Sequence, residues 1–254
     1  MLRSVNLFTA FCFGLASTAA LADFDASLKA YEVHDYATTF NQCATNAKSG
    51  DAKCQIALGE LYSNGLGVPQ DYAEAARWFR KAADQGVATA QFNLGTNYYK
   101  GQGVHQDYAE AVRWYRKAAD QGVAAAKFNL GAHYDKGLGV PQDYAEAARW
   151  YRKAADQGDA DAQYNLAVLY ENGRGVPQSN IVAYAFYNLS ATKYPSENDA
   201  ISKRKAIANA MTEQQIEQGQ KLSSEMSAPG AILKALDRYI QASYRVVKSD
   251  SKRR

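Results

Sequence analysis

Histidine and cysteine, two residue types that commonly bind transition metals, are scarce in this chain. Each occurs only three times in 254 residues. The histidines, His34, His105 and His133, lie far apart, and no cysteine or carboxylate stands at metal-ligand spacing from them. The sequence therefore predicts no metal site, and nothing in it indicates a cofactor.

Motifs that carry catalytic chemistry are also missing. The glycine pairs follow helical patterns rather than strands, which is typical of helix ends and not of phosphate-binding loops. No serine lies in the strand–turn–helix context of a nucleophile elbow. We therefore predict no catalytic residue in this chain.

An excess of one charge sign is absent as well. The chain has 29 lysines and arginines against 26 aspartates and glutamates. Acidic residues slightly outnumber basic ones in 23–192, and the order is reversed in 193–254. The basic residues are not interleaved with aromatic side chains in the way that single-strand binders require, so we predict no binding of nucleic acid.

Long hydrophobic runs are rare, and the one candidate is at the start. The segment "MLRSVNLFTAFCFGLASTAALA" has Arg3, an apolar stretch over residues 5–15 and a small-residue ending. This pattern is typical of a signal peptide over 1–22, cleaved after Ala22, and its apolar part is short for a membrane span. We expect a periplasmic or secreted protein, with an uncleaved anchor as the alternative.

Export changes the meaning of the cysteines. Cleavage would remove Cys12 and leave Cys43 and Cys54, an even number in an oxidising compartment. The pair flanks a junction near Gly50 between two predicted helices, a separation that a disulfide can span. We expect a Cys43–Cys54 disulfide, with two buried thiols as the alternative.

What the chain has in abundance is an internal repeat. The stretch "DYAEAARWFRKAADQG" at 71–86 returns almost unchanged from 107 and again from 143. Self-alignment gives repeats over 50–85, 86–121 and 122–157, with a divergent fourth copy over 158–193. Residues 23–49 are predicted to be a partial repeat, because Tyr36 and Cys43 fall where Tyr72 and Phe79 stand in the next copy.

Each repeat is predicted to hold two helices. In the second copy the first helix covers 87–100, with Ala90, Leu94 and Tyr98 on one face. Gly95 lies inside that pattern, where a missing side chain lets another helix approach. A glycine-containing loop follows. The second helix then begins at Asp107, with Glu110 three residues later as in a capping box.

The same second helix has an apolar and a polar side. Trp114, Tyr115 and Ala118 form the predicted buried stripe, and Arg113 and its basic neighbours form the solvent side. A hairpin of two such helices cannot bury its apolar surface alone. Stacking of consecutive hairpins is therefore expected.

The repeat resembles the Sel-1-like repeat family, relatives of the tetratricopeptide repeats. The resemblance lies in a small residue, "NLG" and a tyrosine in the first helix, the loop "G-x-G-V-P-Q-D-Y" and "KAA" in the second helix. The resemblance implies an all-α fold, an α/α right-handed superhelical solenoid used for protein binding, and no general reaction. Together with the signal-peptide pattern, it favours an exported scaffold that binds a partner protein or peptide of the cell envelope or host, and we expect a monomer. The alternative is the weak β-lactamase or penicillin-binding activity reported for cysteine-rich members, which carry a cysteine pair in every repeat.

The C-terminal part is predicted to close the stack. The second helix of the fourth copy lacks the basic side of its counterparts, so helices within 194–227 should cover it, one of them beginning with a Thr212–Gln215 capping box. Residues 228–254 are predicted to hold a basic amphipathic helix with Ile232 and Leu236 in its apolar stripe. Its stripe either packs on the solenoid or, over 231–248, contacts a membrane surface.

Comparison of the repeats separates framework positions from candidate contacts. Positions that change chemistry along one side of the first helix are predicted to line a concave binding surface. The proposed contact residues are Thr96, Tyr99, Lys100, Asp135, Lys136 and Glu171. The alternative is that these side chains are solvated and have no partner.

Overall fold

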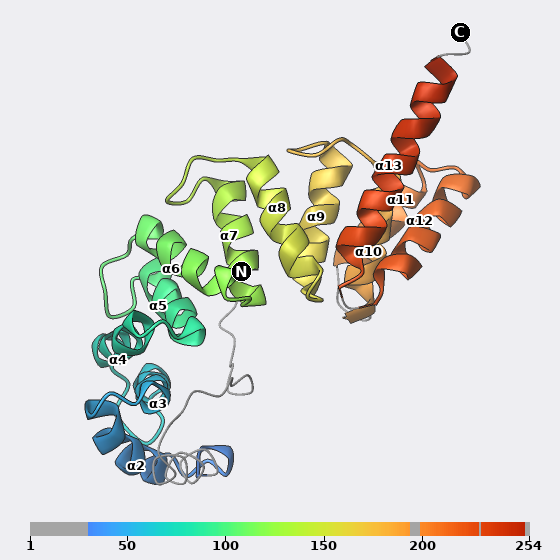
Figure 1. Ribbon diagram of the computed structural model, residues 1–254. Coiled ribbons are helices and arrows are strands. Elements are labelled where there is room, and N and C mark those ends of the chain that lie inside the picture. The colour runs from blue at the N-terminus through green and yellow to red at the C-terminus, as the bar shows by residue number, and fades with distance from the viewer. Residues whose placement is uncertain (1–29, 194–198, 229, 252–254) are drawn as a thin grey trace. The chain divides into compact units, whose positions relative to one another are not determined.

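The computed structural model describes residues 30–193, 199–228 and 230–251, so the predicted signal peptide lies outside the described residues. Within these ranges every regular element is a helix (Figure 1). The helices follow one another as hairpins, which confirms the expected all-α fold of helical hairpin repeats. They group into two compact units. Unit 1 ends at Ala126 and adds Leu138–Val140, and unit 2 comprises Lys127–Gly137 and the chain from Pro141 onward.

The first complete helix described in unit 1 corresponds to the second helix of a repeat. The first helix of that partial repeat is not complete among the described residues. The complete helix is α2 (Tyr36–Lys48), and the hairpins α3–α4 (Ala52–Asn64, Tyr72–Asp84) and α5–α6 (Ala88–Lys100, Tyr108–Asp120) follow it. Each of these helices packs against the next along the chain. Stacking of this kind buries the apolar sides that single hairpins would expose.

The core of unit 1 contains two buried clusters, each shared by neighbouring helices. One cluster contains Cys43, Cys54, Leu58, Leu61 and Trp78, from α2, α3 and α4. A second cluster continues through α4, α5 and α6. Both cysteines are thus buried in one cluster. The disulfide stays a prediction.

Helix α7 (Ala124–Lys136) is divided between the two units. In unit 2 the hairpin α9–α10 (Ala160–Asn172, Asn180–Lys193) follows α8 (Tyr144–Ala155). Most of α10 is buried, because α11 (Asp199–Ala208) and α12 (Glu213–Met226) pack on it as well as α9. The expected Thr212–Gln215 capping box begins α12.

The last helix, α13 (Ile232–Ser251), packs on unit 2 with its N-terminal part. Ile232, Ala235 and Leu236 are buried, and the Leu233 amide donates to Asp156 Oδ1 at 3.2 Å. This part of the predicted apolar stripe is therefore used within the protein's own fold, as one of the two expectations held. No helix in the described ranges combines the length and apolar character needed to cross a membrane.

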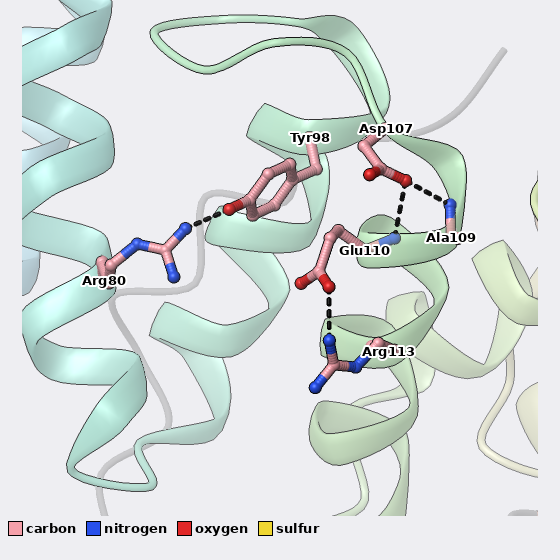
Figure 2. A network of polar contacts seen from close by, with 6 residues as sticks. All are labelled: Arg80, Tyr98, Asp107, Ala109, Glu110 and Arg113. Atoms are coloured by element: carbon pink, nitrogen blue, oxygen red, sulfur yellow. Dashed lines mark hydrogen bonds and ion pairs between the residues drawn. The ribbon is translucent and has the colours of Figure 1, made fainter.

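The predicted caps of the second helices are only half correct. Asp71, Asp107 and Asp143 each accept hydrogen bonds from two amides of the first turn, at 2.8 to 3.0 Å. The glutamate three residues later does not complete a capping box as expected. Its carboxylate binds an arginine one turn further on, as Glu110 binds Arg113 in Figure 2. These surface pairs contribute little to stability.

Candidate functional site

Tyrosine rings of the second helices pack closely against the first helix of the same hairpin. The gap comes from a glycine: a Cβ at Gly95 would lie 2.8 Å from the Tyr115 ring, and one at Gly131 would lie 2.5 Å from the Tyr151 ring. The sequence correctly indicated a close approach at these glycines. What approaches is an aromatic ring whose hydroxyl lies beside polar first-helix residues.

In unit 1 this arrangement changes the role of Thr96. The Tyr115 hydroxyl donates to Thr96 Oγ1 at 3.2 Å, and Thr96 donates to the Phe92 carbonyl at 3.1 Å. Thr96 is 8% exposed. Its hydroxyl and most of its surface are therefore used inside the hairpin, which argues against the expected contact with a partner.

The other two candidates of unit 1 remain accessible. Tyr99 is half-buried and packs its ring on Tyr108, with centroids 5.5 Å apart. Burial is the main cause that raises the pKa of Tyr99, and the electrostatic effect of Tyr108 raises it further. Lys100 is exposed at the end of α5. A rigid aromatic ring beside a mobile cation can contact an extended ligand, since tyrosine loses little entropy on binding.

In unit 2 the first candidate cluster surrounds Asp135. Its carboxylate lies near the buried Tyr151 hydroxyl, which also hydrogen-bonds Asn165 of α9. Burial raises the pKa of Asp135, while the charges of Lys136 and Arg174 oppose that shift. Lys136 is exposed. This half-buried carboxylate lies near two cations and still reaches the surface.

The second cluster surrounds Glu171, one repeat further on. The Tyr187 hydroxyl donates to Glu171 Oε2 at 2.5 Å, and Lys203 Nζ of α11 lies 3.7 Å from the same oxygen. The Tyr187 ring meets the Tyr164 ring edge-on at 5.5 Å. Burial raises the pKa of Tyr164, with smaller effects from Asp199 and Glu171. Glu171 thus belongs to a polar and aromatic surface built from α9, α10 and α11.

Sequence reasoning missed the tyrosines and Lys203. The predicted buried stripe names Tyr115, and Tyr151 and Tyr187 stand at the same position of the next two repeats. Burial in the stripe is correct for the rings but does not account for the hydroxyls. The signal was present in the alignment, because Phe79 of the first repeat becomes tyrosine in the three later ones. A hydroxyl added at a core position needs a hydrogen-bond partner, and the nearest polar first-helix position supplies one.

The residues that bear on other chemistries are placed as follows. Cys43 and Cys54 are 0% and 1% exposed, so neither sulfur is accessible at the surface. His133 is also fully buried, in α7. Among the residues that the structure describes, no three His, Cys, Asp or Glu side chains gather in a way that could hold a metal ion.

Comparison with protein families finds the Sel1 repeat four times, over 52–87, 88–123, 124–159 and 160–194. A Sel1 repeat protein from Oxalobacter formigenes is similar in structure, with a TM-score of 0.69 and 32% identity over 87% of this chain and 86% of that one. A protective antigen present in uropathogenic Escherichia coli strains, which displays an SLR fold, has a TM-score of 0.67 and 30% identity. That match covers 89% of this chain but 54% of the antigen, so the chain spans about half of that protein's length. The comparison with curated proteins finds no match.

Proposed function

The chain belongs to the Sel1 repeat family, and from this premise we propose that it is an exported scaffold that binds a partner protein or peptide through its first helices. Sel1 repeat proteins are typically scaffolds for protein interaction and not enzymes. A fold of this kind acts through the residues that differ between copies, because the shared residues are needed for stacking.

One observation carries the proposal. On first helices of otherwise similar hairpins, Asp135 and Glu171 are half-buried carboxylates, and each lies beside a second-helix tyrosine hydroxyl. Groups already oriented by packing lose little freedom when a ligand binds, so they contribute more affinity than mobile surface charges. Tyrosine and arginine are also enriched in protein interfaces, and Tyr164 and Arg174 flank the two carboxylates.

The proposal predicts that charge, rather than shape, at these two positions holds the partner. The double variant Asp135→Asn, Glu171→Gln keeps side-chain size and one acceptor oxygen at each position, and it removes two charges. We expect about tenfold weaker capture of a partner from a cell-envelope or host-surface extract, with an unchanged melting temperature. Quantitative mass spectrometry of proteins retained by the immobilised chain measures this loss.

A matched control uses carboxylates of the second helices. Glu110→Gln with Glu146→Gln also removes two charges from partly exposed residues that pair with Arg113 and Arg149. This control should retain the partner. Equal loss in both double variants would mean that net charge is responsible, and retention in both would exclude the first-helix carboxylates from binding.

Export is the second part of the proposal, and it has its own measurement. The support is the pattern of residues 1–22 and the burial of Cys43 and Cys54 in one cluster. We expect the protein recovered from the periplasm or the medium to begin at Asp23 and to weigh two hydrogens less than the reduced chain. Intact-mass spectrometry without reductant tests both statements. A full-length mass would contradict cleavage, and an unshifted mass would contradict the disulfide.

A further inference from the structure

In unit 1, glutamine side chains form hydrogen bonds across the turns between consecutive hairpins, and a glutamine that does so is called a brace. Gln85 Nε2 donates to the Gly50 carbonyl at 3.0 Å and to Gln55 Oε1 at 2.8 Å. One repeat later, Gln121 Nε2 donates to the Gly86 carbonyl at 2.9 Å and to Gln91 Oε1 at 2.8 Å. In each case one primary carboxamide occupies a pair of acceptors, formed by a turn carbonyl and a first-helix glutamine.

The same acceptor pair is built again in unit 2. Gln163 follows Gly158 at the spacing that separates Gln55 from Gly50 and Gln91 from Gly86. The three first-helix glutamines are also held in the same way. Their Nε2 atoms donate to the carbonyl eight residues earlier, at 3.0 Å for Gln55, 3.3 Å for Gln91 and 3.4 Å for Gln163. This bond turns the Gln163 Oε1 atom toward the place where the brace would bind.

The brace itself is missing from the fourth repeat. The residue thirty-six positions after Gln157 and seventy-two after Gln121 is Lys193, a residue without a carboxamide. Among the described residues, no hydrogen bond to the Gly158 carbonyl or to Gln163 Oε1 takes the place of that brace. Gln163 is 7% exposed and Gly158 is exposed, so the buried member of the pair favours a donor over no partner.

A pocket of about 490 Å³ lies at this point in unit 2. Gly158, Gln163 and Lys193 all line it, together with the C-terminal turns of α10 and α12 and the start of α13. The volume is within the range of small-ligand sites. The acceptor pair is thus at the wall of a cavity that is large enough to admit a side chain from outside the chain.

The rest of the lining suits the stem of such a side chain. Leu189, Met226 and Ile232 supply an apolar wall, and the last two are almost fully buried. Asn188 also lines the pocket and is held from two sides, because it donates to Ser223 Oγ at 2.8 Å and accepts from Arg204. Apolar walls with a few oriented polar groups are typical of sites that bind one ligand type.

We propose that this pocket binds a primary carboxamide, with its NH₂ group donating to the Gly158 carbonyl and to Gln163 Oε1. The chain itself shows the chemistry twice, in Gln85 and Gln121. A glutamine side chain of a partner segment and free glutamine carry the same group. This site is distinct from the first-helix carboxylates, so it does not depend on the proposed function.

The test is titration of the full chain with three capped amino acids of similar size. These are the N-acetyl, N-methylamide derivatives of glutamine, glutamate and methionine, of which only the first has a primary carboxamide. We expect saturable shifts of the Gly158 and Gln163 backbone resonances in NMR spectra, with about tenfold weaker binding of the other two compounds. Equal binding of the methionine compound would overturn the proposal. Free glutamine in a parallel titration distinguishes a free ligand from a partner's side chain.

A variant that supplies the brace from within the chain gives an independent readout. Lys193→Gln restores the residue found at the same position of the first three repeats and should fill the acceptor pair. We expect it to lower binding of the capped glutamine at least tenfold and to raise the melting temperature. Lys193→Met removes the charge without adding a carboxamide and should bind as the wild type does. Undiminished binding by Lys193→Gln would show that the ligand lies elsewhere.

Discussion

Replacing Gly103 with alanine should lower the free energy of unfolding by about 4 kcal/mol. The loop between α5 and α6 presses Gly103 against the start of α4, so a Cβ there would lie 1.8 Å from the Tyr72 carbonyl oxygen. A backbone atom cannot rotate away as a side chain can. The residue also has φ +72°, which alanine adopts only with strain. Urea unfolding followed by circular dichroism measures the loss.

Gly101→Ala in the same loop is the matched control. Gly101 has φ +68°, but the atom nearest to a Cβ there is the Cβ of Gln106 at 3.2 Å. This variant bears the same conformational strain without the collision and should lose only about 1 kcal/mol. Similar losses in both variants would mean that the loop does not pack tightly on the preceding helix and that strain alone accounts for the effect.

The helical framework could be predicted because the same capping and core residues recur at equivalent positions of several repeats. Asp71, Asp107 and Asp143 each precede a helix, and each accepts the amide hydrogen bonds that its position predicts. Leu94 and Leu130 are fully buried, as their periodic spacing indicates. Repetition averages out local ambiguity, since a position that keeps one residue type in every copy must satisfy the same packing in each.

The candidate site was harder to predict because its residues lie on one helix and form their contacts with side chains of another. The spacing of Thr96 placed it correctly on the first helix but could not show that the Tyr115 hydroxyl comes from the second helix to meet it. That contact depends on the register between the two helices, which cannot be deduced from the periodicity of one helix alone. Lys203 was missed for a similar reason, because it reaches Glu171 from α11, beyond the repeats.

The same limit explains the glutamate partner of the N-caps. A serine, threonine or aspartate three residues before a glutamate is compatible with a reciprocal capping box. In Figure 2, however, Glu110 has an arginine one turn ahead of it, and the charged pair forms instead. At Thr212 the third residue is Gln215, which carries no charge to attract a cation, and the box is complete. Side-chain competition, not spacing, therefore decides which of the two forms.

Unit 1 is expected to lose about 2 to 3 kcal/mol of stability between pH 5 and pH 8 through one side chain, Glu60 of α3. Burial raises the pKa of Glu60 from 4.5 to about 7, and a hydrogen bond with Tyr31 only partly opposes this. A carboxyl group whose pKa is higher in the folded state binds a proton more tightly there. Its stabilising effect is therefore complete below about pH 4.5 and is lost as the pH rises through 7.

The variant Glu60→Gln isolates this effect because it has the size of the protonated form and cannot ionise. Its stability should match the wild type near pH 5 and exceed it by about 2 to 3 kcal/mol at pH 8, measured as the difference between two urea-unfolding series. Tyr31→Phe is the second arm. Burial is also the main cause that raises the pKa of Tyr31, to about 12, so this phenol stays protonated and can donate to the Glu60 carboxylate at pH 8. Its removal should steepen the pH dependence, since an ionised Glu60 then loses its donor. Parallel stability curves for wild type and Glu60→Gln would show that water reaches this carboxylate and that it titrates as an exposed one does.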